Sequence, residues 1–449
     1  MTLHNIEVSR VTPSADSDLV LNSVTIALTF FDLPWLLFSP VKRVFFYRLA
    51  ESSREHFHSF IVPKLKLSLS LVLHNYLPLT GRIIWDPNEP KPSIVVSPND
   101  AVSTTIAETD ADFSLLSSYG QCPVSKLHAL LPELPVSHDS ATAFAVQITL
   151  FPNNGFSIGV AAHHAVLDGK SSSMFVKAWA HICRNRTSLP ENLTPSYDRS
   201  LIKDLTGLDG QMIEMVRSLK GDKTSTSLTP FLSREIGDDV VLATLVLSRH
   251  DIERLRERVK SESPSLNHLS TFVIAYAYVW TCFVNACGGN GERSVSFLFV
   301  GDFRERLDPE LPATYFGNCI FPVGSYCRKA VEFAEEKGFV TAVEILIDLV
   351  KGLSSRKVET IAKEFADSFD AVKESSQFGT VAGSTRFGVY ESDFGWGRPV
   401  KVDIVSIDQG EAISMAERRD ESGGVEIGMC LKKAEMDILF SLFHDGLQN

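Results

Sequence analysis

The chain has 449 residues, 44% of them hydrophobic and 22% charged, which is the composition of a folded globular protein. This length exceeds what one hydrophobic core usually serves, so we expect two domains. The formal net charge of −12 argues against nucleic acid or an anionic membrane as the main partner.

Targeting signals and cysteine motifs are absent from the sequence pattern. Residues 1–18 lack a basic segment followed by an apolar one, so we expect no secretory leader, and no run reaches the roughly 18 apolar residues of a membrane span. The seven cysteines form no CxxC pair. This predicts reduced thiols, no zinc site and a cytoplasmic location.

In the first half, the apolar spacing predicts a strand over 41–49 and a helix over about 63–75. The clearest pattern is AVQITLFPNNGFSIGVAAHH at 145–164. Apolar and polar residues alternate on both sides of the turn at 152–155, which predicts a hairpin of half-buried strands. His164 then lies where the second strand ends.

The stretch AAHHAVLDGKSSS at 161–173 follows this hairpin directly. Gly169 turns the chain, and Ser171 to Ser173 offer N-caps for a helix whose apolar residues run from Met174 to Ile182. A strand–turn–helix junction of this kind can present side chains to a cleft.

The second half begins after a long stretch, 186–238, which is rich in Ser, Thr, Pro, Gly and Asp and reads as a crossover between domains. The later apolar patterns predict strands at 240–248 and 294–307, helices at 249–260, 269–286 and 433–447, and further strands at 402–408, 412–417 and 424–431. The helix at 269–286 is almost wholly apolar and is expected in the core.

The two adjacent histidines admit three interpretations. As metal ligands they would point to opposite faces of a strand, and no third ligand lies at a familiar spacing, so we expect no metal site. His163 is expected to be a buried imidazole bonded to the backbone. His164 could be a packing residue or a general base, because an imidazole can take the proton of an alcohol as it attacks a carbonyl carbon.

Asp168 could orient that imidazole, or it could form a buried ion pair that shapes the loop and would then need a cation. No GxSxG elbow accompanies the motif, so a covalent acyl-serine has no obvious nucleophile. Direct attack on a bound thioester is the more economical reaction.

A second motif, DFGWG at 393–397, changes the interpretation. Together with the histidine motif, the sequence resembles the plant BAHD acyltransferases, which move an acyl group from coenzyme A to alcohols or amines. The resemblance covers nearly the whole chain. It is carried by LTFFDLPWL (28–36), YLPLTGRI (76–83), HxxxD (164–168), GDFRERL (301–307), YFGNC (315–319) and DFGWG.

The resemblance implies an α/β fold of two chloramphenicol-acetyltransferase-like domains, mixed sheets flanked by helices, with the active site at their interface. We expect a first domain over 1–185, the crossover over 186–238 and a second domain over 239–449. Residues of about 376–400 are expected to pack with the first domain.

The same resemblance implies roles for individual residues. His164 matches the general base, and Asp168 matches an aspartate that points away from the substrate and pairs with an arginine. Arg304 is the expected partner, with Arg306 as the alternative. Within DFGWG, we expect a structural loop near the coenzyme channel, held by Asp393, Gly395 and Gly397, and with Trp396 in packing rather than in catalysis.

In some relatives a tryptophan that helps to stabilise the oxyanion stands nine residues before the DFGWG aspartate, where this chain has Ser384. Its hydroxyl, or a backbone N–H of 383–385, is expected to substitute. Coenzyme A is anionic, so basic and hydroxyl side chains near these motifs are candidates to bind it: Arg386, Arg398, Lys401, Ser270 and Thr271. Lys170 is a weaker candidate for an acyl carboxylate.

YFGNC and the overall likeness are most similar to malonyl-transferring enzymes that act on phenolic and flavonoid glucosides. We therefore expect malonyl-CoA as a cosubstrate, a phenolic or flavonoid glucoside as the acceptor, no tightly bound cofactor and a monomer. The alternatives are a coumaroyl-CoA donor, a condensation domain of peptide synthesis, and a non-catalytic family member that acts as a partner protein.

Overall fold

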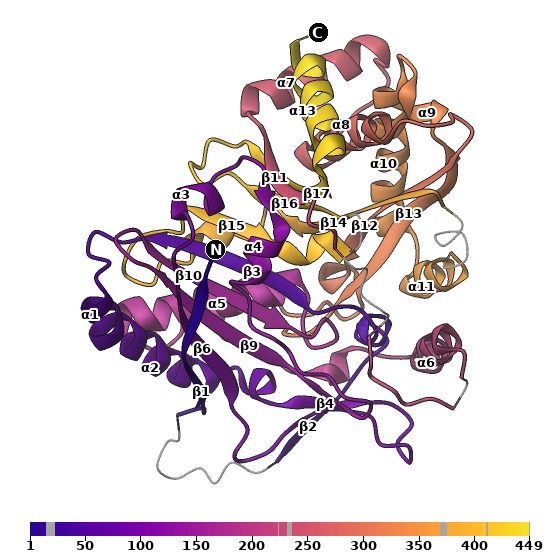
Figure 1. Cartoon of the computed structure of the whole chain (residues 1–449). Helices are drawn as coiled ribbons and strands as arrows, with labels where there is room; N and C mark the ends of the chain where they lie inside the picture. Colours follow the sequence, from indigo (N-terminus) through magenta and orange to yellow (C-terminus); the bar gives the residue numbers. More distant parts are fainter. Residues whose placement is uncertain (15–22, 223, 231–235, 369–374, 410–411, 449) are drawn as a thin grey trace.

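Two large mixed sheets organise the chain in the computed structural model, which describes residues 1–14, 23–222, 224–230, 236–368, 375–409 and 412–448 (Figure 1). The first sheet has the order β1-β6-β9-β10-β3-β15, and only its β6–β9 pair is parallel. Its strands are β1 Leu3–Val11, β6 Val102–Thr109, β9 Phe144–Phe151, β10 Gly155–Ala162, β3 Val41–Arg48 and β15 Lys401–Ile404.

The second sheet has the order β13-β12-β14-β16-β17-β11-β7, and β14 runs parallel to both of its neighbours. Its strands are β13 Ile320–Lys329, β12 Ser294–Asp302, β14 Gln377–Ser384, β16 Ala412–Glu417, β17 Val425–Lys432, β11 Val240–Leu247 and β7 Cys122–Pro123. A small third sheet contains β2 Val24–Ala27, β5 Ser93–Val96, β4 Arg82–Ile84 and β8 Ser140–Thr142.

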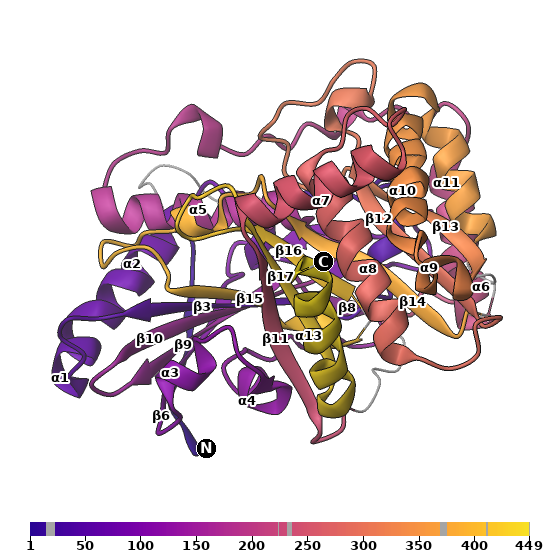
Figure 2. The same cartoon turned by 90° about the horizontal axis from the view of Figure 1, so that it is seen from above.

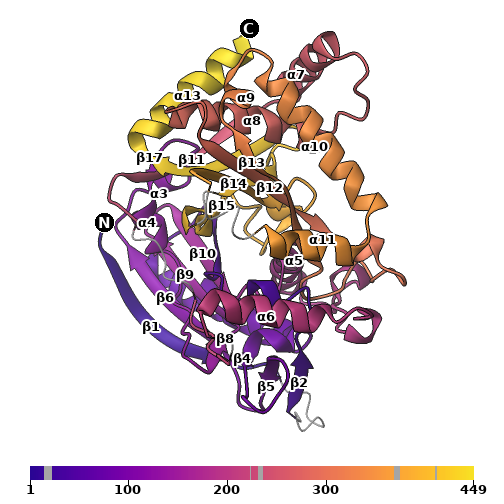
Figure 3. The same ribbon diagram turned by 90° about the vertical axis from the view of Figure 1, so that its right-hand side faces the viewer.

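Helices cover the sheets. The first half carries α1 Arg54–His56, which continues through a π-helical turn (57–61) into α2 Val62–Leu73, and α3 Phe113–Leu116, α4 Val124–His128 and α5 Gly169–Asn185. The second half carries α7 Arg249–Glu262, α8 Thr271–Cys287, α9 Val331–Ala334, α10 Gly338–Ser355, α11 Val358–Asp367 and α13 Lys433–Gln448. Figure 3 shows α8, α10 and α13 on the outer side of the second sheet.

The predicted hairpin is present as β9 and β10, but its strands are buried on both faces rather than one. The polar residues of the alternation face a second apolar layer. The Gln147 side-chain amide donates to the Ala129 carbonyl at 2.8 Å. A Cβ at Gly159 would lie 2.0 Å from the Leu130 carbonyl oxygen, so only glycine fits this close approach.

The expected crossover of 186–238 is not free of regular structure, because α6 spans Leu208–Lys220 within it. The helix has buried residues at Leu208, Met212, Ile213 and Val216, a spacing of one helical face. Residues 223 and 231–235 of this stretch lie outside the described residues. The sequence prediction gave too much weight to the turn-forming residues on both sides of α6.

The two halves exchange strands. β15, from the end of the chain, pairs with β3 of the first sheet (Figure 2). β7, from the first half, pairs with β11 of the second sheet. Of the stretch 376–400, which was expected to pack with the first domain, the first part lies in the second sheet, and Phe394 packs between Tyr47 and Trp179 of the first half. Residues 377–384 are β14 of the second sheet, whereas the chain joins the first sheet at 401–404.

No helix in the described part of the chain is long and apolar enough to cross a lipid bilayer.

Candidate active site

The turn between β10 and α5 carries the two histidines. The His163 N–H donates to the Ala143 carbonyl at 2.9 Å, and the Val166 N–H donates back to the His163 carbonyl at 2.9 Å. The helix cap is Asp168 and not Ser171 to Ser173 as predicted, because its side chain accepts from the Ser171 N–H at 2.9 Å. The cap lies earlier than expected because Gly169 is the first residue of the helix.

His163 is the buried, backbone-bonded imidazole that the sequence predicts. Its side chain is 1% exposed, and Nδ1 accepts a hydrogen bond from the Ala165 N–H at 3.3 Å. Burial, with a contribution from the neighbouring His164, lowers the pKa of His163 to about 3. This imidazole stays neutral at physiological pH and serves the turn.

The His164 ring packs against two aromatic side chains. Its ring stacks on the Trp35 indole with 4.3 Å between centroids and 10° between planes, and Phe38 approaches it edge-on at 6.4 Å. Trp35 ends a short 3₁₀ helix, Leu33–Trp35. Burial lowers the pKa of His164, and the positive charge of Arg43 adds to that effect, while Asp168 opposes it. The imidazole is therefore neutral near pH 7.

Asn318, in the YFGNC motif, ties the backbone of His164 to a buried network. Its Nδ2 donates to the His164 carbonyl at 2.9 Å and to Asp32 at 3.1 Å, and its own N–H donates to Asp32 at 3.0 Å. Asp32 is in turn paired with Arg199 at 2.9 Å. The Asn318 side chain also opposes the lowering of the pKa of His164. The network thus joins the helix of Trp35 to the turn of His164.

Asp168 forms the buried ion pair that was one of its two predicted roles. Its Oδ2 lies 2.7 Å from Arg304, and both side chains are 1% exposed. Arg304 also contacts Asp302 at 3.1 Å and donates to the Gly317 carbonyl at 3.2 Å. Burial disfavours its charge, but the two carboxylates outweigh this effect and raise the pKa of Arg304. The alternative partner, Arg306, instead donates to the Asp302 carbonyl.

The DFGWG loop closes on its own aspartate. Asp393 Oδ1 accepts from the N–H groups of Gly395 at 2.8 Å and Gly397 at 3.0 Å, and Oδ2 accepts from Arg184 at 2.8 Å. Gly395 and Gly397 have φ values of 104° and 94°, which favour glycine. Phe394 is buried between Tyr47 and Trp179. The loop therefore packs on the first half.

Trp396 is half-buried and packs edge-on against Phe156 at 5.8 Å, with Lys64 Nζ 4.6 Å from its ring. Arg184, the partner of Asp393, lies in the last turn of α5, whereas Asp168 caps the first turn. A helix rises about 1.5 Å per residue, so roughly 24 Å of helix separates the two ends. The loop is thus far from His164.

The segment after β14 approaches the start of α5. A Cβ at Gly169 would lie 2.9 Å from the Phe387 ring. Ser384, the last residue of β14, accepts a hydrogen bond from the Arg386 N–H at 3.2 Å, and Arg386 itself is exposed. Phe387, which the sequence gave no reason to single out, is the residue that the structure places against the turn.

The predicted basic cluster for coenzyme A does not form as expected, and Lys401 is the clear correction. Its Nζ is buried and donates to the Ser118 carbonyl and to Thr244, both at 2.9 Å, and it pairs with Asp403 at 3.2 Å. Sequence proximity to DFGWG suggested an exposed lysine, but strand β15 turns the side chain into the interior.

The other candidates have different surroundings. Arg398 is exposed and pairs with Glu421. Ser270 is the N-cap of α8, and the Thr271 hydroxyl accepts from Arg256 at 2.8 Å. Arg256, on α7, also donates to the Leu269 carbonyl at 2.9 Å, so it ties α7 to the start of α8. Lys170 lies 3.8 Å from Asp302.

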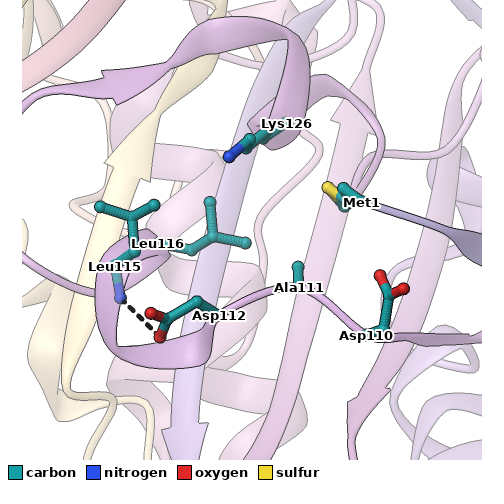
Figure 4. A pocket seen from close by; sticks show the side chains of 7 residues that line it. All are labelled: Met1, Asp110, Ala111, Asp112, Leu115, Leu116 and Lys126. Atoms are coloured by element: carbon teal, nitrogen blue, oxygen red, sulfur yellow. Dashed lines mark hydrogen bonds between the residues drawn. The ribbon is translucent and has the colours of Figure 1, made fainter.

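A shallow hollow lies elsewhere on the surface, lined by Met1, Asp110, Ala111, Asp112, Leu115, Leu116 and Lys126 (Figure 4). Its polar groups serve local structure. Asp112 caps α3, and Asp110 accepts from the Thr2 N–H. None of its lining residues belongs to the histidine turn. Among the described residues, no cluster of His, Cys, Asp and Glu could hold a metal ion.

Comparisons with known proteins show the family of the chain. The family model described as the Transferase family matches residues 1–444. An Arabidopsis thaliana protein named phenolic glucoside malonyltransferase 2 is 73% identical over 100% of both chains. An Arabidopsis thaliana agmatine coumaroyltransferase is 45% identical, again over 100% of both chains.

Solved structures show the same fold. Vinorine synthase aligns over 98% of both chains with a TM-score of 0.72 at 21% identity. TRI101 of F. graminearum, solved with ethyl coenzyme A, aligns over 94% of this chain and 97% of its own with a TM-score of 0.65 at 16% identity. The chain belongs to this Transferase family, the BAHD acyltransferases, and is an acyl-CoA-dependent acyltransferase of two-domain α/β fold.

Proposed function

We propose that the protein transfers a malonyl group from malonyl-CoA to a sugar hydroxyl of a phenolic or flavonoid glucoside. The 73% identity to a phenolic glucoside malonyltransferase supports the substrate pair. One observation on the geometry carries the chemistry: a neutral imidazole, His164, held flat on Trp35 at the junction of β10 and α5.

His164 is the proposed general base. It takes the proton of the acceptor hydroxyl, whose oxygen attacks the thioester carbonyl carbon. When the carbon–sulfur bond breaks, the same proton passes to the sulfur of coenzyme A, so no covalent acyl-enzyme forms. His164 Nδ1 and Asn318 Oδ1 are both buried without a hydrogen-bond partner among the described residues. A hydrogen bond between them would fix the tautomer that leaves Nε2 free for the proton.

The developing oxyanion needs a donor. Ser384 is the proposed group, because its hydroxyl oxygen accepts from Arg386 and its own proton remains available to donate. The segment 384–387 reaches the start of α5 through Phe387. The contribution of one such donor is about 10²–10³ in rate.

Asp168 and Arg304 position the turn and do not touch the reacting atoms. The Asp168 carboxylate accepts from Ser171 and pairs with Arg304. We further propose that Ser270, Thr271, Arg386 and Arg398 lie along the path of coenzyme A. The protein is proposed to work as a cytoplasmic monomer, with no tightly bound cofactor.

A coumaroyl donor is the second candidate, favoured by the 45% identity to an agmatine coumaroyltransferase. The test is free-thiol release from malonyl-CoA and from coumaroyl-CoA, each with and without a simple phenolic glucoside. Glucoside-dependent release from malonyl-CoA, with a malonylated product by mass spectrometry, is expected. Release from coumaroyl-CoA alone would keep the chemistry and overturn the donor. No release from either would favour a non-catalytic protein.

A further inference from the structure

Arg43, on β3, is a buried cation without a carboxylate partner. The residue is 2% exposed, and Nη1 donates to the Ser173 hydroxyl at 2.8 Å, while Nε is buried with no hydrogen-bond partner. In the described part of the chain no carboxylate oxygen lies within 4.0 Å of it. The buried Arg304 and Arg199, by contrast, each pair with an aspartate.

An unpaired buried charge is costly, and native proteins keep one where something else neutralises it. Burial lowers the pKa of Arg43 to about 10, with Glu417 and Asp168 opposing from beyond ion-pair distance. The guanidinium therefore remains charged at neutral pH. It can offer at least one N–H group, in a planar arrangement suited to a carboxylate, to an incoming anion.

The position of Arg43 relates this cation to the reaction. β3 pairs with β10 so that Arg43 lies opposite Val160, four residues before His164. Its side chain reaches the first turn of α5, where a Cβ at Gly169 would come within 3.4 Å of Nη2. Glycine leaves room there for both the guanidinium and the Phe387 ring, which would lie 2.9 Å from the same Cβ. The charge of Arg43 is also near enough to lower the pKa of His164.

The chemistry of the donor suggests which anion belongs here. The phosphates of coenzyme A are separated from the thioester by a long pantetheine arm. The carboxylate of a malonyl group, in contrast, is one carbon away from the carbonyl that His164 would serve. Lys170, the cation nearest to the motif in sequence, is part-exposed and faces Asp302 at 3.8 Å. Arg43 is buried and unpaired, so it gains more from a carboxylate.

We propose that Arg43 determines donor specificity, its guanidinium binding the free carboxylate of a dicarboxylic acyl group and so holding the thioester carbonyl beside His164. This inference rests on the proposed function, because it assigns the residue that distinguishes a malonyl donor from a neutral one. A phenolic donor such as coumaroyl-CoA would leave the charge buried and unpaired, which also disfavours that donor.

The test compares two donors that differ in this carboxylate. Initial rates with malonyl-CoA and acetyl-CoA are measured at a saturating concentration of one phenolic glucoside for the wild type, Arg43→Met, Arg43→Lys and Lys170→Met. The readout is the ratio of kcat/KM for malonyl-CoA to that for acetyl-CoA. For Arg43→Met we expect this ratio to fall at least about 100-fold, because a site built for a charged group discriminates strongly against its absence.

Arg43→Lys keeps the charge and loses the planar fork, so its ratio should fall about tenfold. Lys170→Met should keep the wild-type ratio. If Arg43→Met fails to fold, the ratio for Arg43→Lys decides, and a wild-type ratio there overturns the proposal. Equal losses for both donors in Arg43→Met would show a structural role and overturn it as well.

The wild-type rates separate this proposal from the proposed function. A wild type that does not use malonyl-CoA overturns both. A wild type that prefers malonyl-CoA, together with an Arg43→Met variant of unchanged ratio, overturns only the assignment of Arg43.

Discussion

The two ends of α5 are built alike and differ in burial. At the first end, Asp168 accepts a backbone N–H and pairs with Arg304, and both side chains are 1% exposed. At the last end, Asp393 accepts two backbone N–H groups and pairs with Arg184, whose side chain is 57% exposed. A buried ion pair cannot lose one member cheaply, whereas an exposed pair contributes little. The same residue types thus fix the histidine turn firmly and the DFGWG loop weakly.

The largest effect is expected on catalysis at the buried end. His164→Ala should lower kcat about 10²–10⁴-fold because it removes the proposed base. Its thermal unfolding should change far less than its activity, since the ring contributes to the fold mainly by stacking on Trp35. Steady-state kinetics and calorimetry check this, with His250→Ala, on the exposed side of α7, as the control. Near-native turnover of His164→Ala would contradict the mechanism.

The next effect is on stability at the same end. Arg304→Met should lower the free energy of unfolding by about 3–5 kcal/mol, because Asp168 is then a buried charge without its partner. Urea denaturation measures this difference. Adding Asp168→Asn should recover part of the loss. A loss below 1 kcal/mol would remove the distinction between the two ends of the helix.

The pH dependence of kcat/KM tests whether His164 is buried as the structure shows. Burial lowers the pKa of His164, and the proposed base acts only when neutral. The midpoint of the acid-side decline in kcat/KM should therefore lie below pH 6.5, with a slope of about tenfold per pH unit once the imidazole is mostly protonated. A decline centred above pH 7 would mean that another group titrates or that His164 is solvated.

The smallest effect is expected at the exposed end. Arg184→Met should lower the free energy of unfolding by about 0.2–1 kcal/mol and leave kcat nearly unchanged. Urea denaturation measures this free energy of unfolding as well, and Arg304→Met is the variant with which it is compared. A large loss of activity in Arg184→Met would show that the loop acts on the active site through the length of α5.

Helices and hairpins formed by neighbouring residues could be predicted from the sequence. Pairings between strands that lie far apart in the chain could not. The hairpin, the helix that follows Asp168 and the apolar helix α8 were visible in the spacing of a few residues. The two-residue strand β7 has no such pattern. A strand was predicted at 402–408, where β15 covers 401–404, but its pairing with β3, more than 350 residues earlier in the chain, has no local signal.

The site follows the same rule. The pairing of Asp168 with Arg304 was expected only through family resemblance, and the structure contains it. The network of Asp32, Arg199 and Asn318 joins residues 167 and 286 positions apart, so no local pattern indicates it. Lys401 was misjudged because nothing in its neighbours says which face of a four-residue strand is buried.

The exchanged strands have a consequence for how the chain can be divided. β15 completes the sheet that carries the histidine turn, and β7 completes the other, so each half lacks an edge strand when cut at the crossover. Separately expressed halves should each expose an unpaired edge, and the intact chain should unfold in one cooperative transition. A hybrid of two relatives joined at the crossover would combine β3 and β15 from different parents. We expect such a hybrid to fold only if residues 389–409 come from the same parent as the first half.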